Sequence, residues 1–312
     1  MHRGDRDLAA LPERALTAAL ARWFPRDARR IPIGIGDDAA VVRNARRESV
    51  VTCDPVIEGV HFLPSTDLAL VGRKVVNRNV SDLAAMGARP DFLLVSVILR
   101  RGTSARDRRR LFVGIRGAAR DCGAYVVGGD FAVADAPLVV TITAIGHLRT
   151  RALRRDGARV GDSVHVTGPL GGASLGRHLR FVPRVAAGEA LAACAGVTAA
   201  IDVSDGLLVD LWTLLRASRV PGAELDAAAL PIAVAARTLA RRSGGRALDH
   251  AMADGEDHEL LFAVARGTRW PRAAALRAAR RPIGRLIREP GLWLVDGDRR
   301  ERLPIAGWQH VP

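Results

Sequence analysis

Aspartates recur along this sequence where an apolar run ends or a helix is expected to begin. The members of this set are Asp37, Asp38, Asp54, Asp82, Asp130, Asp202 and Asp205. A carboxylate at the end of a buried strand is poorly solvated, so it is normally paired, hydrogen-bonded or bound to a cation. Several carboxylates in one cleft repel one another unless metal ions neutralise them, and Mg²⁺ often bridges carboxylates to substrate phosphates. The pattern therefore predicts Mg²⁺-dependent nucleotide chemistry.

The sequence allows two interpretations each for His61 and Trp308. His61 follows Asp54 and Glu58 closely, and it is either part of a site or an ordinary loop histidine. Trp308 lies near the C-terminus, where a tryptophan usually packs on the core but can also stack on a flat heterocycle. The residues alone leave both questions open.

A helix and a strand are expected to position the first acids. Residues 67–86 have a helical apolar stripe, with Asp67 as N-cap and Gly87 after the end. Asn79 and Asp82 fall on the buried side of that helix. Residues 49–53 form a short strand that delivers Asp54, and we expect Pro55 to end it.

The rest of the first half alternates between strands and a helix. Residues 92–99 are apolar on both faces, which fits a central strand, and residues 105–122 form a helix that buries Phe112. A strand at 125–127 opens into a Gly128-Gly129-Asp130 turn, where the glycines allow either close approach to a ligand or simply a tight turn. A strand at 138–146 closes this half.

The second half places Asp202 and Asp205 between a strand and a helix. Ser204 or Asp205 is expected to cap the helix that starts near Leu207. A strand at 163–167 leads into a glycine-rich turn at 168–174, which matches neither the Walker pattern nor the dinucleotide-binding pattern. A strand at 260–264 follows the acidic stretch around Glu256.

Size and composition indicate a globular protein of about two domains. The chain has 312 residues, of which 48% are hydrophobic. The charged, glycine-containing stretch 147–162 puts the boundary between domains 1–148 and 149–312. No apolar run approaches the roughly 18 residues that cross a bilayer, and the first residues lack the apolar core of a secretory signal. We therefore expect a cytoplasmic protein without a membrane segment.

The net charge of +14 raises the question of nucleic-acid binding. Lys74 is the only lysine, the arginines are spread along the chain, and the local arginine runs lack interleaved aromatic residues. Nucleic-acid binding is therefore not expected as the main function. Cys53, Cys122 and Cys194 are too few and too far apart to predict a disulfide framework or a zinc site.

The ordered set of motifs resembles the thiamine-monophosphate kinase family, within the superfamily that includes aminoimidazole ribonucleotide synthetase. The motifs that carry the resemblance are 34–40, 54–62, 79–88, 128–130, 201–206, 255–260 and 307–310. The resemblance implies an α/β (α+β) fold of two domains, and a homodimer whose N-terminal strands form a shared barrel. It also implies ATP-dependent phosphorylation of thiamine monophosphate to thiamine diphosphate.

The same resemblance implies roles for individual residues. Several Mg²⁺ ions would be held by Asp38, Thr52, Asp54, Asp82, Asp130, Asp202 and Asp205. ATP, the co-substrate, would contact Gly129, Asp130, Arg155 and Ser204, and thiamine monophosphate would contact His61, Glu256 and Trp308. The attacking phosphate oxygen is already ionised at neutral pH, so no general base is expected.

The sequence departs from the family pattern at several places. Phe131, Cys53, His258 and the Asn77-Arg78 pair replace the family's usual residues, and the segment 171–183 is shorter than usual. Two alternatives therefore stay open. One is a divergent member of the superfamily that acts on another phosphate-bearing substrate, and the other is a non-catalytic nucleotide-binding protein.

Overall fold

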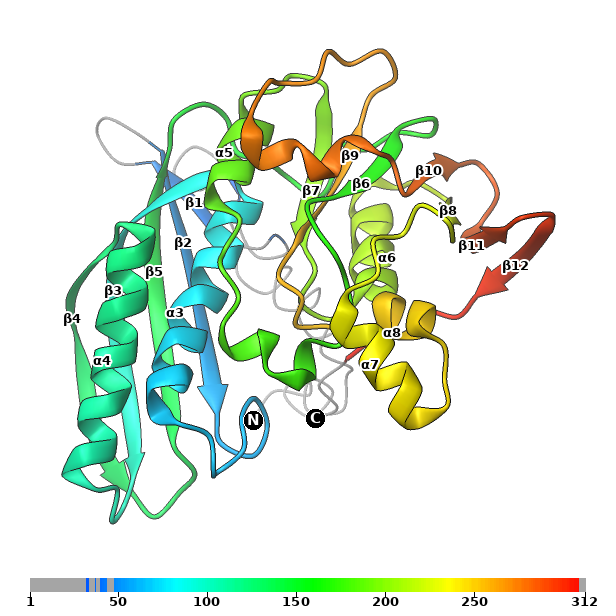
Figure 1. Cartoon of the computed structure of the whole chain (residues 1–312). Coiled ribbons are helices and arrows are strands. Elements are labelled where there is room, and N and C mark those ends of the chain that lie inside the picture. The colour runs from blue at the N-terminus through cyan, green and yellow to red at the C-terminus, as the bar shows by residue number, and fades with distance from the viewer. Residues whose placement is uncertain (1–31, 34–36, 38–39, 44–47, 309–312) are drawn as a thin grey trace, which may run out of the picture.

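The computed structural model describes residues 32–33, 37, 40–43 and 48–308 and builds two β-sheets from them. Figure 1 shows the N-terminal sheet with its helices on the left and the C-terminal sheet on the right. The α/β (α+β) class predicted from the sequence is confirmed. Residues 7–24, whose apolar spacing predicts a helix that Pro25 ends, lie outside the described residues.

The N-terminal sheet has five strands in the order β1-β2-β5-β3-β4. Their bounds are β1 Ala40–Arg43, β2 Glu48–Ile57, β3 Ala88–Arg100, β4 Tyr125–Ala134 and β5 Val139–Leu148. Helices α3 (Leu68–Ala85) and α4 (Ala105–Cys122) cover one face. An added Cβ on Gly72 would lie 2.2 Å from Leu111 O, and one on Gly114 would lie 2.0 Å from Ala69 O. Glycines therefore allow the two helices to pack this closely.

The C-terminal sheet has seven strands in the order β12-β11-β8-β10-β6-β9-β7. These are β6 Ser163–Val166, β7 Val197–Asp202, β8 Gly222–Asp226, β9 Leu260–Val264, β10 Gly284–Ile287, β11 Gly291–Asp296 and β12 Arg299–Leu303. The helices of this half are α5 Val185–Ala192, α6 Leu207–Ser218, α7 Val234–Ser243 and α8 Ala247–Ala253. Leucines of α6 that repeat at helical spacing are buried, as the sequence pattern indicates.

A small apolar cluster joins the two halves. Ala84 and Ala85 at the end of α3 pack with Leu153, Leu191 and Phe262. The division at 148/149 falls just before Leu153 and stays a prediction. Since α3 also carries Asp82, this contact fixes where the first half presents its acids to the second.

Four local predictions are wrong. Pro55 does not end β2: among the described residues, that strand pairs only with β5 beyond Val51, so the missing N–H of proline is tolerated. Gly128-Gly129-Asp130 is not a turn but the middle of β4. Phe112 is 43% exposed, because it lies beside the buried stripe of α4, which consists of Leu111, Ile115, Ala118 and Ala119. Neither Ser204 nor Asp205 caps α6: Asp210 accepts from Asp205 N and Gly206 N instead.

One face of β3 also differs from the central strand that was expected. β3 pairs on both sides, with β5 and β4, but Phe92, Leu94 and Ile98 are between 39% and 45% exposed. Helices cover only the opposite face of the sheet, so the apolar run faces outward in a single chain. The N-terminal sheet therefore carries an apolar surface.

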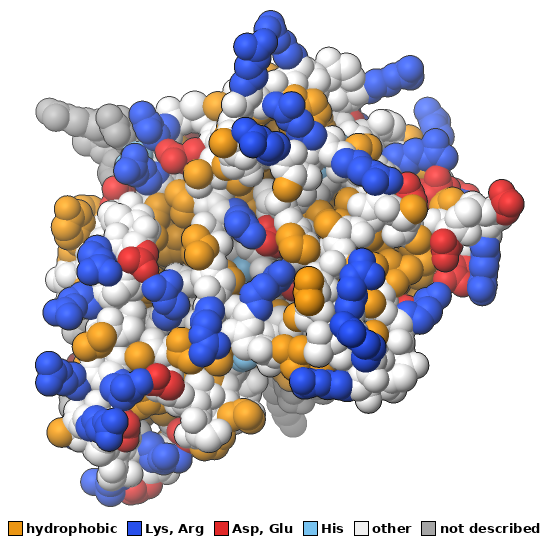
Figure 2. All heavy atoms as spheres, in the orientation of Figure 1, with side chains coloured by type: hydrophobic (Ala, Val, Ile, Leu, Met, Phe, Trp, Pro, Cys, Tyr) orange, Lys and Arg blue, Asp and Glu red, His pale blue; other side chains and the backbone are white. Residues whose placement is uncertain are grey.

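The described residues contain no helix long and apolar enough to cross a membrane. Figure 2 shows Lys and Arg side chains scattered over the visible face rather than gathered in one patch. This distribution agrees with the spread of arginines along the sequence.

Candidate functional site

Asp54 is held in place by α3. Its backbone N–H donates to Asn79 Oδ1 at 2.8 Å, and its carbonyl accepts from Asn79 Nδ2 at 3.1 Å. Its carboxylate Oδ2 accepts from Arg78 Nε at 2.8 Å. The buried Asn79 thus locks the strand to the helix, and Arg78 supplies a positive charge that sequence reasoning did not assign to the site.

Thr52 and Asp82 also meet between β2 and α3. Thr52 Oγ1 donates to Asp82 Oδ2 at 2.7 Å. The side chains of Thr52, Asp54 and Asp82 therefore gather where β2 crosses the last turns of α3. Their role as metal ligands stays a prediction.

Asp202 ends β7 and is only 2% exposed. Its Oδ2 accepts from Ser81 Oγ at 2.6 Å and lies 3.4 Å from His258 Nδ1. Burial by itself raises the pKa of Asp202, but contacts with His258 and Ser81 outweigh burial and place the pKa below its ordinary value. Ser81 of α3 thus brings Asp202 of the second half to the acids of the first.

The loop after β7 connects three distant parts of the chain. Glu256 N donates to Ser204 O at 2.7 Å, and Trp308 N donates to Asp205 O at 2.8 Å. Backbone hydrogen bonds therefore hold the 255–259 stretch and the C-terminal tryptophan against Ser204 and Asp205.

All three residues that the resemblance assigns to the substrate line one pocket of about 140 Å³. The lining is Val60, His61, Arg78, Ser204, Asp205, Asp254, Glu256, His258 and Trp308. His61 Nδ1 accepts from Ile57 N at 3.0 Å, so a neutral His61 carries its proton on Nε2. We call this cavity the His61–Trp308 pocket.

The 171–184 segment packs against the 255–259 stretch, one contact after another. Arg177 bonds Asp257 at 2.6 Å, and Phe181 stacks on His258 with ring centroids 4.0 Å apart. His178 Nδ1 lies 3.1 Å from Glu256 Oε2, and Arg184 pairs with Glu259. The segment that is shorter than the family pattern therefore packs beside the His61–Trp308 pocket. No local sequence motif predicts this role.

Arg155 lies at the rim of the acidic cluster, with its Nε 3.6 Å from Asp37 Oδ1. Burial raises the pKa of Asp37, and the charge of Arg155 opposes that rise. Asp37 Oδ1 is buried and has no hydrogen-bond partner among the described residues. Such an oxygen is a hard donor of the kind that Mg²⁺ prefers, like the carboxylates of Asp54 and Asp82 and the hydroxyl of Thr52. Asp38 lies outside the described residues, and within the described part no three acidic, His or Cys side chains are already grouped as a metal site.

Asp130 and Gly129 lie apart from the other acids. They belong to β4, an edge strand that β3 and β5 separate from β2. Three strand spacings amount to about 14 Å, so one chain does not bring Asp130 next to Asp54 in this sheet. A second pocket of about 1080 Å³ opens beside Gly129 and Asp130, with Phe112, Arg116 and Tyr125 in its lining. We call it the α4–β4 pocket.

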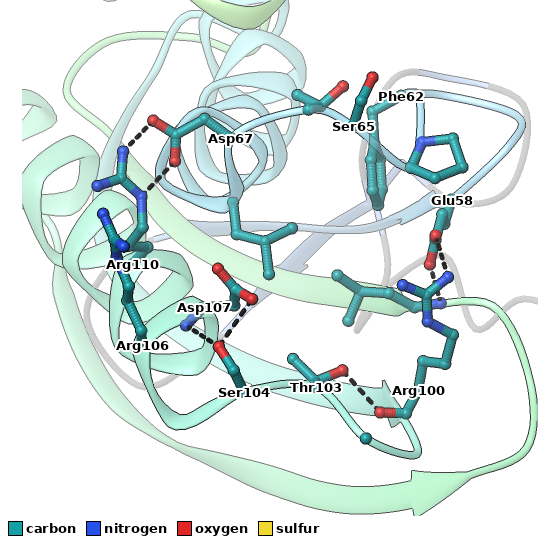
Figure 3. Close-up of a pocket in the computed structure, with 15 residues that line it drawn as sticks. Glu58, Phe62, Ser65, Asp67, Arg100, Thr103, Ser104, Arg106, Asp107 and Arg110 are labelled. Atoms are coloured by element: carbon teal, nitrogen blue, oxygen red, sulfur yellow. Dashed lines mark hydrogen bonds and ion pairs between the residues drawn. The ribbon is translucent and has the colours of Figure 1, made fainter.

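A third pocket, of about 640 Å³, lies where α3 and α4 begin. Figure 3 shows its charged side chains turned toward one another: Arg110 pairs with Asp67, Arg100 with Glu58, and Ser104 with Asp107. None of the residues that the resemblance assigns to the site lines this pocket. The polar groups named here are already satisfied by one another.

Comparisons with known proteins agree with the sequence motifs. Residues 36–148 match the family described as AIR synthase related protein, N-terminal domain. The chain is 38% identical to a thiamine-monophosphate kinase of Rhodopirellula baltica, over 94% of this chain and 95% of that protein. It is 36% identical to the Mycobacterium tuberculosis protein of the same name, over 89% and 85%. Among solved structures, AaThiL complexed with AMPPCP and TMP superimposes with a TM-score of 0.84 at 28% identity, over 99% of both chains.

Proposed function

The chain belongs to the thiamine-monophosphate kinase family, and on that premise we propose that it transfers a phosphoryl group from ATP to thiamine monophosphate. The reaction is direct and in-line, depends on Mg²⁺ and yields thiamine diphosphate. The observation that carries the proposal is the His61–Trp308 pocket. Its lining comes from α3, from the loops after β2 and β7, from the stretch 254–258 and from Trp308. Asp54, Asp82 and Asp202 lie next to this pocket.

The acceptor in this reaction is a phosphate oxygen that is already ionised at neutral pH. A protein base is therefore unnecessary, and the site must instead align two anionic phosphates and neutralise their charge. Mg²⁺ ions would supply that neutralisation when bound. Their ligands would be Asp38, Thr52, Asp54, Asp82, Asp202 and Asp205 of one chain, with Asp130 coming from a second copy, because each chain's own Asp130 lies three strand spacings from β2. Arg78, which lines the pocket beside Asp54, adds a fixed positive charge at the same place.

Thiamine monophosphate would bind in the His61–Trp308 pocket through three kinds of contact. The Glu256 carboxylate offers a negative charge to the cationic thiazolium ring. His61 Nε2–H offers a hydrogen-bond donor, and the 53%-exposed Trp308 ring offers a stacking surface. These are the contacts that a flat, cationic ring system attached to a phosphate requires.

ATP would bind with its base in the α4–β4 pocket and its phosphates toward Asp130, Arg155 and Ser204. The pocket has aromatic and apolar walls from Phe112, Ile115 and Tyr125, which suit a purine. The AMPPCP in the AaThiL structure supports ATP as co-substrate for that protein.

A homodimer accounts for the outward apolar face of the N-terminal sheet. Phe92, Leu94 and Ile98 of β3 continue into Tyr125 of β4, which pairs with Phe92, and all four are at least 39% exposed. A second copy placed on this face would cover it and close a shared barrel from the two sheets. It would also place Asp130, which pairs with Ser96 on the outward face, at the dimer interface within the 1–148 domain.

The direct test is an assay with purified full-length protein, ATP, Mg²⁺ and thiamine monophosphate, in which thiamine diphosphate is followed by chromatography. We expect product that requires all three components and disappears with EDTA. Unphosphorylated thiamine serves as the control acceptor and should give no diphosphate. Absence of product, with ATP binding still measurable by calorimetry, would contradict the proposal and favour another phosphate-bearing substrate or a binding role.

A further inference from the structure

Lys74 is completely buried at the centre of the candidate site. Its side chain is 0% exposed, and it is the only lysine of the sequence. Its Nζ lies 2.7 Å from His61 O, 2.8 Å from His178 Nδ1 and 2.5 Å from Glu256 Oε1. An ammonium group has three protons to donate, so these three partners use all of them.

Burial of an ammonium group is costly unless a negative charge compensates it. Burial lowers the pKa of Lys74, while the charge and hydrogen bond of Glu256 oppose that change. For Glu256 itself, burial raises the pKa, but His178 and Lys74 outweigh burial and hold the pKa well below its ordinary value. Glu256 therefore stays ionised in the folded protein.

The backbone of Glu256 is also fixed in an uncommon conformation. Its φ of 53° lies in the left-handed region, which non-glycine residues seldom adopt. Its N–H donates to Ser204 O, and its two carboxylate oxygens are held by Lys74 and His178. The carboxylate still lines the pocket and is 33% exposed, so its remaining lone pairs are open to a ligand.

His178 completes the arrangement from the 171–184 segment. Its Nδ1 accepts from Lys74 when the ring is neutral, and donates to Glu256 Oε2 when that nitrogen carries a proton. When Nδ1 carries the proton, α3 and the 171–184 segment hold the same carboxylate from two sides; when Nδ1 is unprotonated, His178 instead holds Lys74 Nζ in place beside Glu256. Lys74 does not line the pocket, so it acts only through the groups it contacts, Glu256, His61 and His178.

We infer that Lys74 and His178 are positioning residues, which hold the Glu256 carboxylate in place to bind the cationic ring of thiamine monophosphate. This inference rests on the proposed function. Lys74 and His178 would contribute to the affinity for the thiamine part of the substrate and would have no role in ATP binding. Lys74 would thus help to determine which acceptor substrate binds, although it is buried and does not touch that substrate.

The test is a double-mutant cycle between Lys74→Met and Glu256→Gln in the full-length protein. Lys74→Met should raise the KM for thiamine monophosphate about tenfold and leave the KM for ATP within about twofold. In the Glu256→Gln background the same change should add little, because the group through which Lys74 acts is already neutral. A purely structural role would lower stability and affect both substrates.

His178→Gln provides a second variant if Lys74→Met fails to fold, because His178 is 15% exposed at its side chain and tolerates replacement more readily. It should shift the thiamine monophosphate KM in the same direction by a smaller factor. Arg180→Gln, in the same segment, is the matched control. Unchanged KM in His178→Gln, or equal effects of Lys74→Met with and without Glu256→Gln, would overturn this inference alone. A wild-type protein that neither binds nor phosphorylates thiamine monophosphate would overturn the proposed function as well.

Discussion

Thr52 Oγ1 donates a 2.7 Å hydrogen bond to Asp82 Oδ2, which joins β2 to α3 across 30 positions of the sequence. An Asp82→Asn variant keeps an oxygen to accept this bond but loses the negative charge. We expect turnover to fall at least about 100-fold, since even residues that only orient metal ligands cost 10–100-fold. The melting temperature should change little. Wild-type turnover in Asp82→Asn would contradict its assignment as a metal ligand.

Arg78 neutralises Asp54 through its 2.8 Å contact, so Arg78→Met should make that carboxylate more available to a cation. We expect Mn²⁺ affinity, measured by calorimetry without nucleotide, to increase about tenfold, or about 1.4 kcal/mol. Arg73→Met is the matched control on the same helix, because Arg73 pairs with Asp121 on the surface. Unchanged or weaker Mn²⁺ binding in Arg78→Met would show that Arg78 does not compete with a cation.

Phe112 is 43% exposed and lines the α4–β4 pocket. If the base of ATP stacks there, Phe112→Ala should raise the KM for ATP about tenfold, a typical loss for one aromatic–base contact. The KM for thiamine monophosphate should stay the same. Val113→Ala is the control, because Val113 is 45% exposed and lies outside the pocket. Equal KM values for ATP in both variants would place the base elsewhere.

The neighbouring strand β3 leaves no room for a side chain at Gly129. An added Cβ would lie 1.8 Å from Val95 O, and its φ of 153° is one that side chains rarely adopt. Gly129→Ala should therefore lower the free energy of unfolding by about 1–3 kcal/mol in a denaturant titration. Gly128→Ala should be nearly neutral, since its nearest neighbour is Leu94 Cδ2 at 3.4 Å. A fully stable Gly129→Ala that only loses ATP binding would reverse this interpretation.

Asp257 should make stability depend on pH. Burial raises the pKa of Asp257 to about 7, above the ordinary 3.8. The charge of Arg177 lowers this pKa, and the nearby carboxylates of Glu259 and Asp254 raise it further. Between about pH 4 and 7 the native state keeps this proton, while the unfolded state releases it. The free energy of unfolding therefore falls as pH rises through that window, by up to about 1.4 kcal/mol per pH unit. Asp257→Asn should flatten the decline in melting temperature from pH 5 to 8. Asp135→Asn, at an exposed site, should retain it; identical profiles for Asp257→Asn and wild type would refute the assignment.

Local sequence patterns predicted several elements well. The Asp67 cap and Gly87 mark α3, and Gly123 marks the end of α4, because capping chemistry involves residues a few positions apart. Predictions about Pro55 and the Gly128-Gly129 pair were wrong, because strand ends depend on which neighbour supplies the hydrogen bonds. That neighbour is distant in sequence.

The sequence by itself determined the family, the α/β class and the set of acids, because each motif is a short run whose residue types carry the signal. Tertiary structure decided which of them meet: Ser81 reaches Asp202, Trp308 reaches Asp205, and Asp130 stays on an edge strand. It also decided the surroundings of Glu256, which Lys74 and His178 approach from 182 and 78 positions away. Charge and hydrogen-bond energies depend on distances of a few ångströms in space, and the order of residues does not specify those distances.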